Sequence, residues 1–328
     1  MKIKIFLAAT IFTLSQGWLV QCVNKNPVQI FTFRAGHVAN SDHTWHKALE
    51  YLREILYERS KGKIIIEIYP NEQLGKEIEL IRSIKTGIAD MTITAGTLQN
   101  WTDIVAFSDM PFIFRDTTHM QKLAEGPLGK KMEERILEET GLRILAYFQR
   151  GPRHLTSNRP IKTPSDLNGL IVRIPNVPSY TIAWNALGAN PTPMALSEVF
   201  TSLQQGTIEG QENPLAMISS TNLFEVQDYV NLTAHLLSWA YVVIGDKQFR
   251  KMPLSLQEIF LEAAKDMQHY EHQLFLQNEV TLRQELENKG MTFIEVDKNA
   301  FREKGSPAVY QSLSPEMKEL YDQIEAIK

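Results

Sequence analysis

LIVRIPNVPSYTIAWNALGANPTPMALSEVFTSLQQGTIEGQENP, residues 170–214, is the stretch of this chain that says most about its fold. It begins with a short apolar run that is typical of a buried strand, and that run contains one charged residue, Arg173. Two segments of helical character follow, and the stretch ends in the turn Gly-Gln-Glu-Asn-Pro. Strand and helix signals in alternation predict an α/β fold.

Arg173 needs an anionic partner, because removing an unpaired guanidinium from water is unfavourable. The planar fork of an arginine suits a carboxylate that accepts two parallel hydrogen bonds. Asp166 is the only acidic residue close to it in the sequence. Two partners therefore stay open: the carboxylate of a ligand, or a salt bridge to a distant Asp or Glu.

The rest of the chain extends this alternation into two α/β units. Strand-like residues 29–33, 63–69 and 91–95 alternate with helical residues 42–60 and 77–86, which predicts a parallel sheet covered by helices. The pattern restarts near residue 142, so a second unit of the same class is expected. No flexible linker separates the units, which indicates several chain crossings rather than one tether.

One segment near the C-terminal end predicts an unusually long helix. Residues 255–289 contain neither Gly nor Pro, and Gly290 supplies a stop signal. A helix of this length would extend roughly 50 Å at 1.5 Å per residue, enough to cross both units. The alternative is two helices with a break that the sequence does not reveal.

The N-terminus predicts export. Lys2 and Lys4 precede an apolar run over residues 5–14 that is too short to span a bilayer, so residues 1–22 read as a signal peptide. Cys22 is the only cysteine, so disulfides are not expected. It could carry a lipid anchor, although Gln21 is a poor residue before such a cysteine; the alternative is cleavage after Cys22. Export without disulfides indicates a bacterial envelope protein.

Charge limits the partners of the exported chain. Removal of residues 1–22 takes away two lysines and no acid, which moves the formal net charge from −4 to −6. An acidic chain without a basic stripe argues against binding to nucleic acid or to an anionic membrane. A single basic cleft for a small anion remains compatible with it.

Several polar residues follow predicted strands or open a predicted helix, where the ligands of α/β proteins bind. Together they would suit a hydroxylated carboxylic acid, with arginines on the acid group and amide or carboxylate oxygens on hydroxyls. Each also has an ordinary structural alternative, such as a turn, a helix dipole or core packing. The candidate ligand-binding residues are Arg173, Arg153, Asn213, Glu77 and His37, together with Trp239 at the expected return crossing between the lobes, where an aromatic ring could pack on a sugar face.

Enzymatic chemistry has little support in the sequence. There is no Gly-x-Ser-x-Gly elbow, no phosphate-binding glycine loop and no thiol suited to nucleophilic attack, so an exported enzyme is the weaker alternative. The pairs His43 with His46 and His269 with His272 could hold a metal, but exposed helical histidines are the commoner explanation. No metal and no cofactor is expected.

Long motifs in order along the chain closely resemble the solute-binding proteins of TRAP (tripartite ATP-independent periplasmic) transporters. They are LTSNRPIKTPSDLNGLIVRIPN, GANPTPMALSEVFTSLQQGTIEGQENP and LFEVQDYVNLT, together with Ile68-Tyr69-Pro70, Gln73-Leu74-Gly75 and Met110-Pro111-Phe112. The resemblance implies a two-lobed periplasmic-binding-protein-like α/β fold with a long helix spanning both lobes. Lobe I would comprise residues 28–150 and 239–278, and lobe II residues 151–238 and 279–328.

The resemblance also implies a function. Arg173 stands where the family holds the substrate carboxylate, and Arg153 and Asn213 would line the same cleft. The expected role is a periplasmic receptor that delivers a small organic acid to TRAP membrane permease subunits. A sensor that signals to a membrane receptor through the same cleft is the alternative.

The identity of the acid depends on four positions. The branch that binds sialic acid has Asn, Glu and Phe where this chain has Gly36, Ala95 and Leu196, and an Asp where it has Glu77. Loss of hydrogen-bonding partners in a buried site reduces discrimination strongly. A smaller sugar acid, such as a hexuronate or keto-aldonate, is therefore expected in place of sialic acid.

Overall fold

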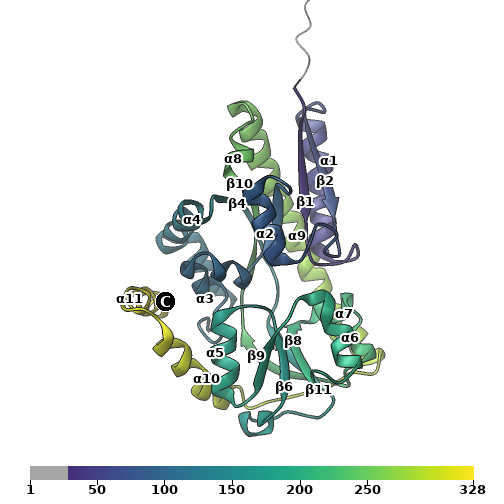
Figure 1. Ribbon diagram of the computed structural model, residues 1–328, viewed down its shortest axis with the longest axis vertical. Coiled ribbons are helices and arrows are strands. Elements are labelled where there is room, and N and C mark those ends of the chain that lie inside the picture. The colour runs from purple at the N-terminus through teal and green to yellow at the C-terminus, as the bar shows by residue number, and fades with distance from the viewer. Residues whose placement is uncertain (1–28) are drawn as a thin grey trace, which may run out of the picture.

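The computed structural model describes residues 29–328 and consists of two α/β lobes with a long helix alongside both (Figure 1). The expected signal peptide and Cys22 lie outside the described residues. Within residues 29–328, none of the helices combines the length and the apolar composition needed to cross a membrane.

Lobe I is built on a five-stranded sheet with the order β2-β1-β3-β10-β4. The β-branched run in β2 and the apolar face of α1, both expected from the sequence, pack together in its core. The strands are β1 (Phe31–Gly36), β2 (Ile64–Tyr69), β3 (Met91–Thr94), β4 (Leu142–Gln149) and β10 (Trp239–Gly245). The helices that pack on them are α1 (Thr44–Arg59), α2 (Glu77–Thr86), α3 (Thr117–Glu125), α4 (Pro127–Thr140) and α8 (Asp246–Phe249).

Lobe II is built on a six-stranded sheet with the order β11-β9-β5-β8-β6-β7. The strand that carries Arg173 is β6, which lies between β7 and β8 and pairs parallel with both. The strands are β5 (Arg153–Ser157), β6 (Ile171–Ile174), β7 (Asn190–Pro193), β8 (Gly210–Pro214), β9 (Tyr229–Leu236) and β11 (Thr292–Ile294). The shorter helices of this lobe are α5 (Pro178–Leu187), α6 (Val199–Gln204) and α7 (Leu215–Ser220).

Both sheets are mixed, whereas the alternation of strands and helices predicted parallel ones. In lobe I, β10 runs antiparallel to β3 and β4, and in lobe II, β5 runs antiparallel to β8 and β9. The reason lies in the chain crossings. The chain crosses between the lobes after β4 and again after β9. β5 and β10 therefore start at the edge of their sheet that faces the other lobe and run away from it, opposite to β4 and β9.

The long helix is continuous, as the absence of Gly and Pro predicted. α9 (Leu254–Asn288) has 35 residues and is buried near its start against lobe I, through Phe260, and near its end against lobe II, through Leu286. It therefore braces both lobes along one side of the molecule (Figure 1).

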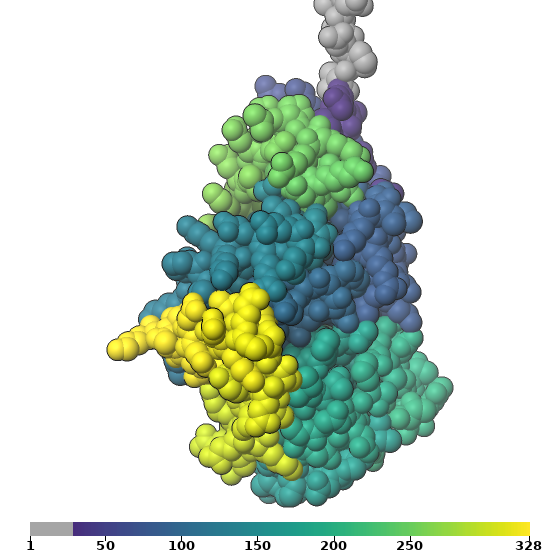
Figure 2. All heavy atoms as spheres, turned by 60° about the vertical axis from the view of Figure 1, so that its left-hand side comes forward, coloured from purple at the N-terminus to yellow at the C-terminus, as the bar shows by residue number. Residues whose placement is uncertain are grey.

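The C-terminal segment differs from the expected lobe boundaries, which assigned residues 279–328 to lobe II. α10 (Lys298–Ser312) packs against α5 through Phe301, but α11 (Pro315–Glu325) places Met317, Leu320 and Ile324 in the core of lobe I beside Ile104. The amphipathic pattern of α11 shows that it needs an apolar surface, but not on which lobe that surface lies. Figure 2 shows this segment in yellow against both the blue and the teal regions.

Candidate functional site

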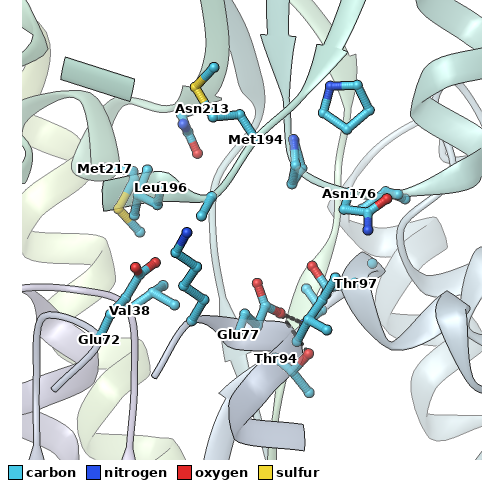
Figure 3. Close-up of a pocket in the computed structure, with 18 of the residues that line it drawn as sticks. Val38, Glu72, Glu77, Thr94, Thr97, Asn176, Met194, Leu196, Asn213 and Met217 are labelled. Carbon is cyan, nitrogen blue, oxygen red and sulfur yellow. Dashed lines mark hydrogen bonds between the residues drawn. The ribbon is translucent and has the colours of Figure 1, made fainter. Parts of the chain in front are cut away.

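A cavity of about 430 Å³ lies between the two lobes, and side chains from both of them line it. In Figure 3, Met194 and Asn213 of lobe II approach from one side, and Glu77 and Thr97 of lobe I from the other. The lobe II residues come from the ends of β6, β7 and β8, where the connecting loops of the sheet converge, as expected for an α/β binding site.

Arg173 is buried in the wall of this cavity, with 3% of its surface exposed. Its Nε and Nη2 atoms donate to the backbone carbonyl of Met194 at 2.9 and 2.6 Å. Among residues 29–328 no carboxylate forms a salt bridge with it, so the distant Asp or Glu that the sequence left open is not found there. Burial lowers the pKa of Arg173 to about 10, but the side chain stays charged at neutral pH. The cavity wall thus contains a buried cation that no carboxylate of residues 29–328 approaches within salt-bridge distance.

Arg153 lines the same cavity but is already paired. Its Nη2 atom donates to Glu212 Oε1 at 2.7 Å, and the Glu212 carboxylate is completely buried. His235 Nε2 lies 3.1 Å from Glu212 Oε2. Burial opposes ionisation of Glu212, yet the charge of Arg153 and the hydrogen bonds from His235 and Arg153 hold its pKa at about 2. Arg153 is therefore one half of a buried ion pair, whereas Arg173 forms no such pair within the part of the chain that the structure describes.

Asn213 lies at the end of β8 and is fixed by two hydrogen bonds. Its Oδ1 atom accepts from Arg153 Nη2 at 3.1 Å, and its Nδ2 atom donates to Gln211 Oε1 at 2.6 Å. Its amide lines the cavity (Figure 3). The sequence predicted a turn over Gly-Gln-Glu-Asn-Pro, but these five residues form strand β8 and all of them are buried.

Glu77 opens α2 on the opposite wall. Its Oε1 atom accepts hydrogen bonds from Thr94 Oγ1 at 2.7 Å and from the Ala95 backbone N–H at 3.3 Å. Figure 3 shows the carboxylate pointing into the cavity from lobe I. A carboxylate held in this way can accept a further hydrogen bond from a ligand hydroxyl through Oε2.

His37 and Trp239 do not line this cavity. His37 is fully buried and its Nε2 atom lies 3.0 Å from His46 Nδ1. Trp239 packs edge-on against Tyr147 and Tyr241 in the core of lobe I. His37 follows β1 and Trp239 begins β10, but both side chains are buried within lobe I. Neither is included among the ligand contacts proposed below.

Of the positions expected to select the acid, Ala95 and Leu196 line the cavity and Gly36 does not. A Cβ atom on Gly36 would lie 2.5 Å from Leu80 Cδ2, so a side chain there would meet the core of lobe I. Position 36 therefore faces α2 in the core of lobe I, which the sequence alone did not indicate.

Asp109, Arg150 and Tyr180 are among the cavity-lining residues that were not expected from the sequence. Arg150 Nη1 lies 3.6 Å from Asp109 Oδ1. Arg150 is three residues from Arg153, in Gln-Arg-Gly-Pro-Arg, and this spacing was the available signal. Asp109 was visible only as an acid before Met110-Pro111, with no indication of its partner. No set of three or more His, Cys, Asp or Glu side chains suited to a metal ion occurs within the described part of the chain.

Comparisons with known proteins match this chain over most of its length. The model of the family described as bacterial extracellular solute-binding protein, family 7, matches residues 35–316. A solute-binding protein of Roseobacter denitrificans is 45% identical over 296 residues, which is 90% of this chain and 91% of that protein. The 2,3-diketo-L-gulonate-binding periplasmic protein of Escherichia coli is 32% identical, over 82% of this chain and 83% of its own.

Solved structures also match this chain over most of its length. A TRAP periplasmic solute-binding protein of Roseobacter denitrificans, solved with bound L-galactonate, superposes with a TM-score of 0.88 at 45% identity, covering 90% of this chain and 99% of that one. A TRAP protein of Xanthobacter autotrophicus, solved with bound β-D-galacturonate, has a TM-score of 0.86 at 30% identity, with coverage of 90% and 100%.

Proposed function

Because the chain belongs to family 7 of the bacterial extracellular solute-binding proteins, we propose that it is the extracytoplasmic receptor of a TRAP transporter and binds a sugar acid between its lobes. The observation that carries the proposal is Arg173, a buried cation at the cavity wall without an acidic partner among the described residues. A ligand carboxylate would supply the missing charge through charge-assisted hydrogen bonds.

The other contacts follow from the geometry. Arg173 would bind the carboxylate, with its guanidinium oriented beforehand by the Met194 carbonyl. Asn213 from lobe II and Glu77 from lobe I would bind ligand hydroxyls. Arg153 would contribute positive potential and would hold Asn213, because its own charge is taken up by Glu212. A ligand that touches both walls stabilises the closed arrangement of the lobes.

The chemical class of the ligand is supported by two relatives. The Roseobacter protein was solved with an aldonate and the Xanthobacter protein with a hexuronate, both of them hydroxylated monocarboxylates. A hexuronate, aldonate or keto-aldonate is therefore proposed here, in preference to sialic acid, since the side chain of Ala95, where the sialic-acid branch has a glutamate, offers no hydrogen bond to a ligand in the cavity.

The partners and the compartment complete the proposal. Membrane permease subunits of a TRAP transporter would receive the ligand in the periplasm, after export directed by residues 1–22. The role requires no catalytic step, no metal and no cofactor. A sensory role through the same cleft remains the second candidate, and genes for permease subunits beside this one would favour transport over it.

A ligand screen tests the proposal. Thermal-shift measurements with uronates, aldonates, keto-aldonates, sialic acid and C4-dicarboxylates should give the largest stabilisation with a sugar monoacid. Calorimetry should then show that Arg173→Gln weakens this ligand by more than 100-fold, since a charge-assisted pair is lost. Arg159→Gln, at an exposed arginine of the same lobe, is the control. Equal affinity in the Arg173 variant and the wild type would refute the assignment.

A further inference from the structure

Arg82 is an exposed cation at the rim of the cleft. It belongs to α2, and the part of this helix that lines the cavity consists of Glu77, Ile78, Glu79 and Arg82. Residues 83–86, which complete the helix, do not line it. Since the side chains of a helix lean toward its N-terminus, the guanidinium of Arg82 is directed back toward the cavity from the last position on α2 that reaches it.

The side chain of Arg82 makes no hydrogen bond and no salt bridge within residues 29–328. Glu79 is its nearest acid along the helix, three residues earlier. The Oε2 atom of Glu79 accepts instead from the backbone N–H of Lys76 at 3.0 Å, as part of the capping of α2. The charge of Arg82 is therefore left to the solvent and to whatever enters the cleft.

The other cations of the lining differ from Arg82 either in burial or in pairing. Arg173 also lacks a carboxylate among the described residues, but it is buried and bound to the Met194 carbonyl. The remaining three each face a carboxylate: Lys76 that of Glu198 at 2.5 Å, Arg153 that of Glu212, and Arg150 that of Asp109 at 3.6 Å. Within the described chain, Arg82 is thus the one cation of the lining that is both exposed and outside salt-bridge range of any acid.

An approaching carboxylate meets an acidic wall on lobe I. Glu72, Glu77 and Glu79 all line the cavity from this side, and the whole chain has a formal net charge of −4. Repulsion at the entrance slows the association of an anion, whereas a cation at the entrance accelerates it. The location of Arg82 at the rim of this wall is suited to the second effect.

We propose that Arg82 captures the carboxylate of the ligand at the rim of the cleft and thereby accelerates association, before the carboxylate reaches its final site on Arg173. Arg82 then positions the ligand during the encounter and makes no contact with it in the final complex. The inference rests on the proposed function, because it takes the ligand to be a carboxylate and Arg173 to be its anchor.

Stopped-flow kinetics with L-galactonate and D-galacturonate, two monocarboxylates, test the proposal on the full chain. At about 10 mM salt, where charges act over about 30 Å, Arg82→Gln should lower the association rate constant about three- to fivefold. At about 1 M salt, where this range falls to about 3 Å, the variant and the wild type should associate equally fast. The dissociation rate constant should be the same in both proteins at each salt concentration.

Two further substitutions at the same position separate the charge from the shape of the side chain. Arg82→Lys keeps the charge and should restore the association rate of the wild type. Arg82→Glu adds a fourth carboxylate to the wall and should slow association further than Arg82→Gln. The urea midpoint of all three variants should equal that of the wild type, because the exposed side chain has no hydrogen-bond partner within the described chain.

Lys251→Gln is the matched control, since it changes the net charge by the same amount as Arg82→Gln. Lys251 is an exposed residue that follows α8, at the end of lobe I away from lobe II (Figure 1). It does not line the cleft cavity. Its substitution should leave the association rate constant within the error of the wild type at about 0.1 M salt, where charges act over about 10 Å, whereas Arg82→Gln should still be slower.

The outcomes separate this inference from the proposed function. Capture by Arg82 is refuted if Arg82→Gln associates as fast as the wild type at low salt, if Lys251→Gln is slowed as much at about 0.1 M salt, or if Arg82→Gln changes only dissociation. In each of these cases the receptor role is retained, because the ligand still binds. If neither probe nor any other sugar acid of the screen binds to the wild type, the proposed function is refuted, and the capture role with it.

Discussion

Arg173 donates from both Nε and Nη2 to the backbone carbonyl of Met194, so one edge of its guanidinium is fixed before any ligand arrives. These two hydrogen bonds orient the Arg173 side chain but do not neutralise its charge. The opposite case is Arg153, whose charge is neutralised inside the protein by Glu212. The two arginines line one cavity but have different roles. Arg173 is available to a ligand, and Arg153 holds the surrounding polar groups in place.

This difference predicts opposite effects on the stability of the ligand-free protein. Arg173→Gln should leave the free energy of unfolding unchanged or raise it, because a buried cation without an anion is removed while a donor to Met194 is kept. Urea denaturation without ligand measures this. A loss of more than about 2 kcal/mol would show that Arg173 has a structural partner after all.

Arg153→Gln should instead destabilise the protein by about 3–5 kcal/mol, because Glu212 would remain buried without its cation. The double variant Arg153→Gln with Glu212→Gln should lose less than the sum of the two single variants. Additive losses in a double-mutant cycle would contradict the coupling seen between these side chains.

The fold could be predicted well from local patterns. The continuous α9 follows from residues 255–289 without Gly or Pro, and α1 buries the face that carries Trp45, Leu49 and Leu52. The lobe on which α11 packs could not be predicted. An amphipathic pattern shows that a helix needs an apolar surface, but not which lobe provides that surface. The prediction of parallel strands was wrong for a related reason, because the direction of β5 and β10 depends on where the chain crosses between the lobes.

The candidate site was predictable where a residue conflicts with its surroundings. Arg173 stood out as a charge in an apolar strand, whereas Arg150 and Asp109, far apart in sequence, are brought together only by the tertiary structure. His37 was expected in the cleft because it follows a strand, but the sequence could not tell that its side chain turns toward His46.

Glu271, near the middle of α9, predicts that stability decreases as pH rises from about 4.5 to about 8. It is fully buried, accepts from Thr44 Oγ1 at 3.0 Å, and lies 3.3 Å from the Gln149 amide nitrogen, close to the first crossing between the lobes. Burial raises its pKa to about 8 from an ordinary value of 4.5. The folded state therefore binds the extra proton between these values, and the resulting stability is lost as pH rises toward 8.

Denaturation between pH 7 and 8 should show a loss of about 1 kcal/mol per pH unit in the wild type and a flatter profile in Glu271→Gln. Buried His43, with a pKa lowered to about 3 by burial first and then by the charge of Arg150, is neutral throughout this range and adds no slope. Equal slopes in both proteins would contradict an uncharged Glu271.

Lys76 and Glu198 form an ion pair across the cleft, with Lys76 Nζ 2.5 Å from Glu198 Oε1. Lys76 is the residue before α2 in lobe I, and Glu198 lies in the turn after β7 in lobe II. Asn100 Nδ2 also crosses between the lobes, to the Asn176 carbonyl at 2.9 Å. Opening of the cleft must break both contacts, so Lys76→Met should accelerate ligand dissociation. Because the side chains are about half exposed, the expected change is only two- to fivefold.

High salt should accelerate ligand dissociation from the wild type but not from Lys76→Met. Screening weakens the exposed pair of Lys76 and Glu198, which the variant already lacks. Stopped-flow dissociation of the best ligand from the screen, at low and high salt, makes this comparison. Lys63→Met, at an exposed lysine of lobe I that does not line the cavity, is the matched control and should behave like the wild type. Identical dissociation rates in all three proteins would show that the cleft opens without breaking this pair.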